Sequence, residues 1–188
     1  HSALKLGTDA MLLGALTDFE KPSSIIDIGT GIGILALMMA QKHLCPITAI
    51  DIDEGAVCDA KKNCAESSWN NRIFVECCSL QNYINQTKNE FDGIICNPPF
   101  FSNSPTNNSI VKTMARHTIS LDPNDLFYGI NKLLSKTGSA SIIIPTSEKQ
   151  LFTEKAQKHN LYTIKEVEIY PFSSSEKANR AVIFFSKK

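Results

Sequence analysis

The chain has 188 residues, 43% of them hydrophobic, so it can bury a core and we expect one domain spanning residues 1–188. Lysine plus arginine and aspartate plus glutamate each number 19, which excludes a strong overall basic field that would attract a nucleic acid. Any contact with RNA must come from a local patch or from a segment outside this sequence. No run approaches the roughly 18 consecutive apolar residues of a membrane helix, which disfavours a membrane protein.

The six cysteines show no pattern typical of a disulfide framework or a zinc site. No two are spaced as CxxC, and two of them are adjacent. We therefore expect reduced thiols, no bound metal and a cytoplasmic location. The N-terminus lacks a signal-peptide pattern and begins close to functional-looking residues, so we expect the natural N-terminus to be truncated. The cysteines are Cys45, Cys58, Cys64, Cys77, Cys78 and Cys96.

An apolar helix is predicted near the N-terminus, over residues 9–16. Thr8 or Asp9 stands where a helix N-cap is expected, because both side chains accept hydrogen bonds from the free N–H groups of a first turn. The same hydroxyl and carboxylate could instead contact a ligand. The residues alone leave both interpretations open.

A glycine-rich turn, residues 29–33, lies between a predicted strand at 24–28 and an apolar helix at 34–40. Glycines at alternate positions allow a sharp turn and close approach to a ligand, and the helix start presents unpaired N–H groups. This pattern indicates a cofactor cradle, although a tight turn needs glycine for its geometry alone. The spacing is not the full G-x-G-x-x-G of dinucleotide binding, which disfavours a nicotinamide oxidoreductase.

Polar side chains follow the next two predicted strands, at 46–50 and 73–77. Asp51 stands about 20 residues after the glycine turn, the distance at which an acid binds ribose hydroxyls in nucleotide-binding α/β folds. Ser79 ends the following strand along the same sheet edge, where a polar side chain could bind an adenine ring. A helix is predicted between these two strands, over residues 54–66.

A fourth strand, residues 91–96, ends in Asn97-Pro98-Pro99-Phe100. Two prolines fix φ and remove two donors, so this turn is stiff and presents acceptors. Asn97 adds a side-chain carbonyl and Phe100 an aromatic face, which together suit a planar group that carries an NH2. A Pro-Pro turn that merely ends a strand is the simpler alternative, and the glycine turn upstream argues against it.

The segment from 101 to 121 is polar and without a clear period, which predicts a flap facing the substrate. Arg116 and His117 are its charged cluster, for which a solvated surface pair is an equally good interpretation. Further on we expect a helix from Pro123 to about residue 134, capped by Asp122 and ended by Thr137-Gly138.

The C-terminal part is predicted to hold a strand at 139–144, a helix at 148–158, and two antiparallel strands at 161–170 and 181–185. Lys177 and Arg180 lie in the connection between those two strands, where they could contact phosphate or simply be solvated. Strand and helix alternate five times before this closing pair. The pattern predicts a doubly wound α/β sheet.

These motifs resemble the class I S-adenosylmethionine-dependent methyltransferases, and the resemblance covers nearly the whole chain. It implies a Rossmann-like, seven-stranded sheet of order 3-2-1-4-5-7-6 with strand 7 antiparallel. Four stretches are more narrowly similar to bacterial tRNA adenine-N6 methyltransferases that modify the adenine beside the anticodon of a valine tRNA. They are residues 5–15, 27–31, 97–100 and 115–118.

The resemblance assigns a role to each matching residue. Asp27, Gly29 and Gly31 would line the methionine part of S-adenosylmethionine, with Thr8 and Asp9 closing over it. Asp51 and Ile52 would hold the ribose side, and Ser79 the cofactor adenine, where relatives often carry aspartate; the Cys78 backbone N–H could compensate. Asn97 and Pro98 would accept from the target amine beside Pro99, with Phe100 stacked on the base. The substrate side would be Phe101, Arg116, His117, Lys177 and Arg180.

The resemblance therefore implies methyl transfer to the N6 amine of a tRNA adenine in the anticodon loop, by a monomer without metal or membrane. A glutamine-N5 methyltransferase of release factors and a guanine-N2 methyltransferase of ribosomal RNA are the nearest alternatives, since both use the same turn. A third alternative is a cofactor-binding module that has lost its activity. Such a module would not need to keep Asn97, so the intact turn argues against it.

Overall fold

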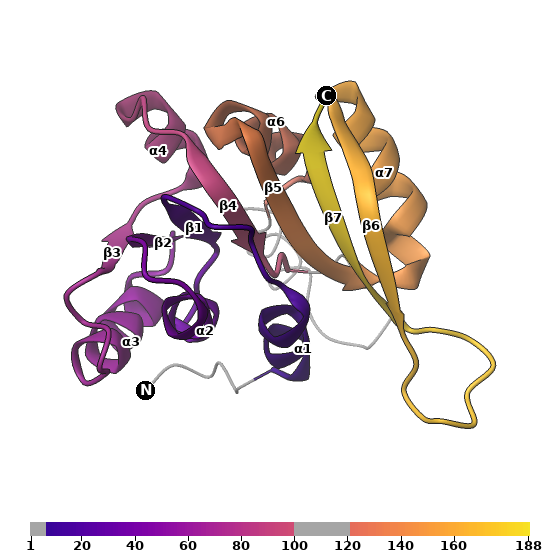
Figure 1. The fold of residues 1–188 in the computed structure, drawn as a ribbon, viewed down its shortest axis with the longest axis horizontal. Helices are drawn as coiled ribbons and strands as arrows, with labels where there is room; N and C mark the ends of the chain where they lie inside the picture. Colours follow the sequence, from indigo (N-terminus) through magenta and orange to yellow (C-terminus); the bar gives the residue numbers. More distant parts are fainter. Residues whose placement is uncertain (1–6, 100–120) are drawn as a thin grey trace, which may run out of the picture.

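The computed structural model describes residues 7–99 and 121–188. The expected sheet is confirmed: within these residues seven strands form one sheet in the order β3-β2-β1-β4-β5-β7-β6 (Figure 1). The first five strands run parallel, and β7 is antiparallel to both β5 and β6. The strands are β1 (Ile25–Ile28), β2 (Ile47–Asp51), β3 (Ile73–Cys77), β4 (Phe91–Cys96), β5 (Leu134–Pro145), β6 (Leu161–Ile169) and β7 (Arg180–Lys187).

Helices cover both faces of the sheet, as a parallel sheet requires. The helices α1 (Thr8–Leu16), α2 (Ile34–Lys42) and α3 (Glu54–Ala65) share one hydrophobic core with one face. The helices α4 (Leu80–Gln86), α6 (Pro123–Leu133) and α7 (Lys149–Lys158) share a second core with the other face, and a 3-10 turn, η1 (Thr146–Glu148), precedes α7. All four residues of the central strand β1 are buried for this reason.

One lysine joins α1 to α2. The Lys42 ammonium donates to the backbone oxygens of Gly14, Ala15 and Thr17 at 2.8, 2.9 and 2.7 Å. These carbonyls lie at the C-terminal end of α1, where a helix leaves its acceptors unpaired and a cation is favoured. The buried Thr17 hydroxyl also donates to the Ser141 hydroxyl at 2.9 Å, which fixes the end of α1 against β5.

The start of α1 corrects the predicted cap. Gly7 is the N-cap, and neither Thr8 nor Asp9 makes a side-chain cap hydrogen bond. The Asp9 carboxylate instead accepts from Arg180 Nε of β7 at 2.9 Å, across 171 positions of sequence. Asp9 is therefore bound by Arg180, a residue distant in sequence, although its position next to the helix start predicts a capping role.

The start of β5 also differs from the prediction. The helix α6 ends at Leu133 and β5 begins at once, so Thr137-Gly138 lies inside a strand and ends no helix. A register shift between Phe91 and Gly93 of β4 accommodates the extra residues. Gly138 is needed because a Cβ there would lie 2.8 Å from the Asp92 backbone oxygen. The glycine therefore marks a close approach of two strands, which a sequence pattern cannot distinguish from a turn.

The helix α4 was not predicted. It has seven residues, too few for a clear period, and it begins where the Ser79 hydroxyl accepts from the Asn82 N–H at 3.1 Å. By contrast, the predicted Asp122 cap of α6 is confirmed, with its carboxylate accepting from the Asn124 N–H at 2.7 Å.

All six cysteine thiols are free. No helix in the described ranges is long and apolar enough to cross a membrane.

Candidate active site

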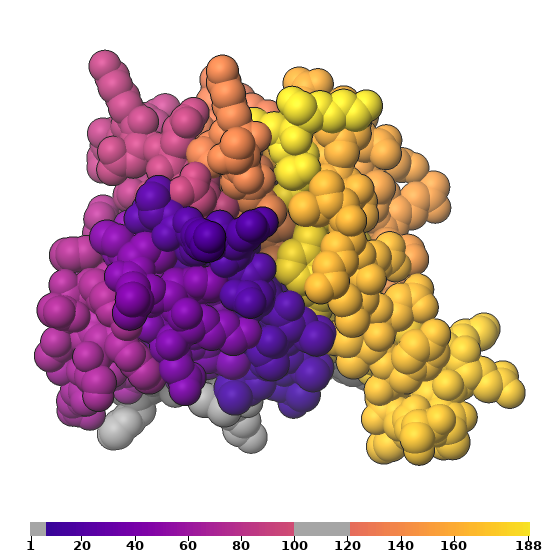
Figure 2. All heavy atoms as spheres, in the orientation of Figure 1, coloured from indigo at the N-terminus to yellow at the C-terminus, as the bar shows by residue number. Residues whose placement is uncertain are grey.

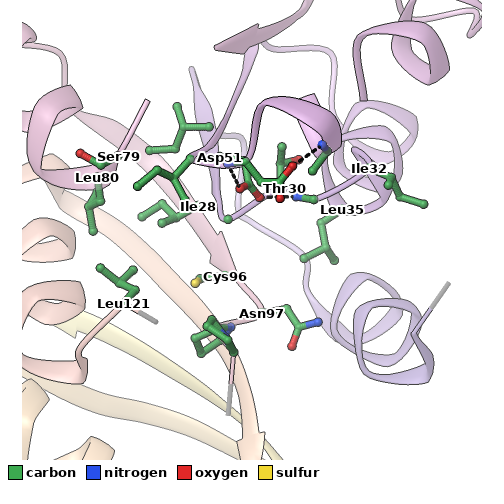
Figure 3. Close-up of a pocket in the computed structure, with 18 of the residues that line it drawn as sticks. Ile28, Thr30, Ile32, Leu35, Asp51, Ser79, Leu80, Cys96, Asn97 and Leu121 are labelled. Carbon is green, nitrogen blue, oxygen red and sulfur yellow. Dashed lines mark hydrogen bonds between the residues drawn. The ribbon is translucent and has the colours of Figure 1, made fainter. Parts of the chain in front are cut away.

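A cavity of about 560 Å³ opens at the carboxyl ends of the parallel strands. Its walls come from the glycine turn after β1, the end of β2, the residues after β3 and the turn after β4 (Figure 3). Gly7, the N-cap of α1, and Ala10 within α1 also line it. This is the edge at which open α/β sheets bind ligands, and a volume of this size suits a small molecule. The strands β1 and β4 are neighbours, with Ile28 opposite Cys96, so the two predicted turns begin side by side.

The glycine turn has the backbone that its sequence predicts. Gly29, Gly31 and Gly33 have φ values of +73°, +55° and +87°, a region that residues with a Cβ seldom adopt. At Gly33 a Cβ would also lie 3.3 Å from the Ala60 Cβ of α3. The turn therefore needs glycine both for its dihedral angles and for its packing.

The N–H groups of this turn are mostly used within the protein, which corrects the expected unpaired donors. The Gly29 and Thr30 N–H groups donate to the Ile50 backbone oxygen at 2.9 and 3.0 Å. The Gly31 N–H donates to Asp51 Oδ2 at 2.7 Å, and the Gly33 N–H donates to the Thr30 backbone oxygen at 3.0 Å. The fold thus sets the shape of the cradle before any ligand binds.

Asp27 lies beneath the turn and is fully buried. Its Oδ2 accepts from the Thr30 hydroxyl at 2.5 Å and from the Ala36 N–H at 3.1 Å, which ties the turn to the start of α2. Its Oδ1 has no hydrogen-bond partner in the described parts of the chain. Burial raises the pKa of Asp27 from 3.8 to about 7, helped by the nearby Asp51 charge and opposed by the hydrogen bonds from Thr30 and Ala36. Asp27 supports the cradle from below and is not among its lining residues.

Asp51 lies in the cavity wall, where it also organises backbone. Its Oδ2 accepts from the Gly31 N–H, and its Oδ1 accepts from the Asp53 N–H at 3.0 Å. Each carboxylate oxygen has a second lone pair, so Asp51 can still accept from ligand hydroxyls. Ile52, next to it, lines the cavity with 54% of its surface exposed and offers an apolar contact.

Ser79 lines the cavity, but its hydroxyl is the cap acceptor of α4. The Cys78 N–H, which we expected to compensate for the missing aspartate, donates to the Asp51 backbone oxygen at 2.9 Å. That expectation is wrong, because the backbone hydrogen bonding between β2 and β3 continues one residue past β3. The Ser79 hydroxyl proton is not used by this cap, so the hydroxyl can still donate to a ligand.

The turn after β4 places Asn97, Pro98 and Pro99 in the cavity lining. The Asn97 side-chain oxygen is buried and has no hydrogen-bond partner within residues 7–99 and 121–188. Figure 3 shows Asn97 on a different side of the cavity from Thr30 and Asp51. A buried acceptor without a donor costs about 1–3 kcal/mol, so a ligand that brought a donor to this atom would recover that cost.

Two thiols in the lining are poor nucleophiles. Burial raises the pKa of Cys96 well above its usual value, with the Asp27 and Asp51 charges acting in the same direction. Burial also raises the pKa of Cys78, together with Glu76 and Cys77. Since the thiolate is the reactive form, neither side chain is set up for covalent catalysis at neutral pH.

Four other predicted site residues, Thr8, Asp9, Lys177 and Arg180, are not among the described lining residues of the cavity. Asp9 and Arg180 bind each other. Lys177 is exposed on the connection between β6 and β7. Phe100, Phe101, Arg116 and His117 lie outside the described residues, so their predicted roles stay predictions.

Sequence reasoning missed the apolar part of the lining. Leu80 and Leu121 face the cavity, together with Ile28, Leu35 and Ile50. Most of these side chains also belong to the two hydrophobic cores, so nothing in their type distinguishes them from packing residues. Their position just after a strand, as for Leu80, is the one signal that could have indicated them.

The comparisons with known proteins agree with this geometry. The family model of the methyltransferase small domain matches residues 1–124. The tRNA1(Val) (adenine(37)-N6)-methyltransferase of Trichodesmium erythraeum is 38% identical over 99% of this chain and 79% of its own length. The enzyme of that name from Shewanella pealeana is 38% identical over 84% of this chain, which covers 65% of that relative.

A solved structure supports the fold independently of sequence. Geranyl diphosphate methyltransferase, in complex with S-adenosylmethionine, has a TM-score of 0.66 and 11% identity, covering 95% of this chain and 84% of that one. At this identity the likeness concerns the fold alone. With the curated relatives and the family model, it leads to one assignment: the chain belongs to the tRNA1(Val) (adenine(37)-N6)-methyltransferase family of S-adenosylmethionine-dependent enzymes.

Proposed function

We propose that this chain transfers a methyl group from S-adenosylmethionine to the N6 amine of adenine 37, beside the anticodon of tRNA1(Val), as the names of its relatives state. The observation that carries the proposal is the buried Asn97 side-chain oxygen in the cavity wall, which has no hydrogen-bond partner in the described part of the chain. An acceptor without a donor, at a turn whose prolines lack N–H groups, is complementary to an amine.

The cofactor fits the other half of the cavity. S-adenosylmethionine, when bound, supplies an electrophilic methyl group on a sulfonium. The glycine turn lets the backbone approach it closely, and the second lone pairs of Asp51 accept from ribose hydroxyls. Ile52 and Leu80 provide apolar surface for a purine, and the Ser79 hydroxyl can donate to one of its nitrogens.

Asn97 and the Pro98 backbone oxygen act on the target amine. An aromatic amine is a weak nucleophile because its lone pair is delocalised into the ring. Two acceptors on its N–H bonds orient that lone pair toward the methyl group and stabilise the positive charge that develops. As the new N–C bond forms, the bond between the methyl group and the cofactor sulfur would break and leave a neutral thioether. The methylated amine then loses its proton to solvent, so no general base is needed beforehand.

The target adenine must leave its stack to enter the cavity. Unstacking costs a few kcal/mol and is least costly in a single-stranded loop, which favours an anticodon loop as substrate. In this proposal Phe100 stacks on the base, and Phe101, Arg116 and His117 surround it. Lys177 is a candidate phosphate contact, whereas Arg180 already binds Asp9, which weakens its assignment. We also propose that residues 1–188 act as one domain, as a cytoplasmic monomer.

The test is to incubate the chain with methyl-labelled S-adenosylmethionine and separate pools of tRNA, ribosomal RNA and release factor. We expect label in tRNA as N6-methyladenine at position 37, and none in a tRNA1(Val) transcript whose adenine 37 is replaced by guanine. A glutamine amide also presents an NH2 to Asn97, so methylation of the release factor is the alternative that this experiment must exclude first. Label in that pool or in ribosomal RNA alone would overturn the proposal.

A further inference from the structure

The connection between β6 and β7, residues 170–179, leaves the sheet at the same edge as the cavity. Pro145 ends β5 opposite Arg180 of β7, which in turn lies opposite Ile169 of β6. Figures 1 and 2 show this connection projecting beyond the body of the molecule. Ile142 is level with Cys96, and Pro145 lies three residues further along β5. The base of the connection therefore lies roughly 10 Å beyond the level of Cys96 and, two to three strands over, about 10–14 Å to its side.

The base of this connection is fixed by hydrogen bonds. The Thr146 hydroxyl donates to the Ala178 backbone oxygen at 2.8 Å, and the Asn179 N–H donates to the Ile169 backbone oxygen at 3.0 Å. Near its tip, the Ser175 N–H donates to the Phe172 backbone oxygen at 3.0 Å, and the Phe172 N–H donates to the Ser175 hydroxyl at 3.2 Å. Phe172 is therefore held in a defined turn at the tip.

Two aromatic side chains on this connection are exposed to solvent. Phe172 is 73% exposed and Tyr170 is 48% exposed, so neither contributes a full ring to the core. The Tyr170 hydroxyl donates to a Glu168 carboxylate oxygen at 3.2 Å, which orients its ring. Lys177, beside Glu176, is the exposed cation of the same segment. We call residues 170–179 the aromatic arm.

We propose that the aromatic arm binds the RNA substrate by stacking Phe172 on an unpaired base of the anticodon loop, with Lys177 near a phosphate. This inference rests on the proposed function, because it needs a single-stranded RNA loop whose target adenine enters the cavity beside Asn97. Bases outside the stack are recognised by stacking on aromatic side chains, which suits an exposed ring at the same edge of the sheet as the cavity.

The size of the arm favours RNA over a protein partner. A stable protein interface buries about 800 Å² on each side, more than the narrow tip of a ten-residue connection offers. A single ring is sufficient for a base, since stacking needs only one flat face. The arm carries one acid and one base, Glu176 and Lys177, so its net charge does not repel a phosphate backbone.

The test measures binding of a fluorescent RNA hairpin, with the anticodon stem and loop of tRNA1(Val), to the full chain by polarisation. We expect Phe172→Ala to raise the Kd roughly 10-fold, the order expected for one lost stacking contact. Phe172→Trp should bind like the unaltered chain, and Phe172→Leu should bind like Phe172→Ala because it keeps apolar surface without a ring. Lys177→Ala should weaken binding and reduce its salt dependence by about one phosphate contact.

Leu44 gives a matched control. It is 92% exposed ahead of β2, at the opposite edge of the sheet, and Leu44→Ala should leave the Kd unchanged. Equal binding by Phe172→Ala and the unaltered chain would overturn the inference, as would absence of hairpin binding or full binding by Phe172→Leu. Nucleoside analysis tests the proposed function separately. Hairpin binding without formation of N6-methyladenine would refute the proposed function alone. Methylation together with unchanged binding by Phe172→Ala would refute the role of the aromatic arm alone.

Discussion

The glycine turn after β1 and the proline turn after β4 begin side by side, yet they treat their hydrogen-bonding groups in opposite ways. The glycine turn uses its N–H groups internally, on Ile50, Asp51 and Thr30. The proline turn has no N–H groups at its two prolines, and its Asn97 oxygen is buried with no donor among the residues that the structure describes. The glycine turn thus has most of its N–H groups paired within the protein, whereas the proline turn leaves an acceptor that a ligand could pair.

This difference separates stability from function within one cavity. A satisfied turn stabilises the fold and keeps the cradle in shape, whereas a buried unpaired acceptor lowers stability until a donor arrives. Substitutions in the two turns should therefore affect turnover and fold stability differently. Those in the proline turn should change turnover and leave the fold unaffected, and those in the glycine turn should change both.

The largest effect is expected for Asn97→Ala. It removes the acceptor that orients the target amine, so turnover should fall roughly 10²- to 10³-fold, as for other single donors or acceptors to a transition state. The Kd for S-adenosylmethionine should not change and the melting temperature should not fall, because the Asn97 side-chain oxygen makes no hydrogen bond within the described residues. Single-turnover transfer, thermal melting and titration calorimetry check this. Asn85→Ala, in an exposed part of α4, is the control, and retained turnover in Asn97→Ala would refute the role.

Asp51→Ala should show the opposite pattern. Loss of the hydrogen bonds to the Gly31 and Asp53 N–H groups should lower the free energy of unfolding by about 1–3 kcal/mol. The Kd for S-adenosylmethionine should rise at least 10-fold, because the turn loosens and the ribose acceptor is gone. Calorimetric titration and urea unfolding measure both. Glu20→Ala removes an exposed acid ahead of β1 as control, and an unchanged Kd in Asp51→Ala would contradict the assignment.

Asp27 should make the glycine turn depend on pH. Its folded pKa of about 7 lies above the ordinary 3.8, so the folded state holds a proton that the unfolded chain releases. Stability from this group is therefore full below pH 4 and is lost as pH rises through 7, by at most about 1.4 kcal/mol per pH unit. Urea unfolding at pH 5 and 7.5 should show the unaltered chain losing stability relative to Asp27→Asn. No change relative to Asp27→Asn between these two pH values would instead mean that the folded carboxyl is already charged at pH 5.

The smallest effect is expected for the Asp9–Arg180 pair, which lies outside both turns. Their side chains are 20% and 30% exposed, so a double-mutant cycle with alanine should give a coupling energy under about 1 kcal/mol. High salt should reduce it. The Lys149–Glu166 pair, exposed to a similar extent, is the matched comparison. A coupling of several kcal/mol in unfolding experiments would show that α1 depends on this pair far more than its exposure implies.

Much of this arrangement was predictable from sequence, because local patterns carry it. Alternating apolar segments and polar strand ends placed Asp51 and Asn97 at one sheet edge, and the glycines at 29, 31 and 33 matched positions of positive φ. Residues that also serve the core, such as Leu80, gave no such signal. Thr137-Gly138 gave a misleading one, because a glycine in a turn and a glycine in a tight strand contact look alike.

By itself, the sequence determined the order of elements, the two turns and the chemical types facing the cavity, since periodicity, glycine and proline act within a few residues. Only the tertiary structure decided which groups were left unpaired. Asp9 was bound by Arg180, the Cys78 N–H by the Asp51 backbone oxygen, and the Asn97 oxygen by nothing in the described residues. The physical reason is that each donor and acceptor pairs with whatever the folded chain brings near, including groups that are far away in sequence.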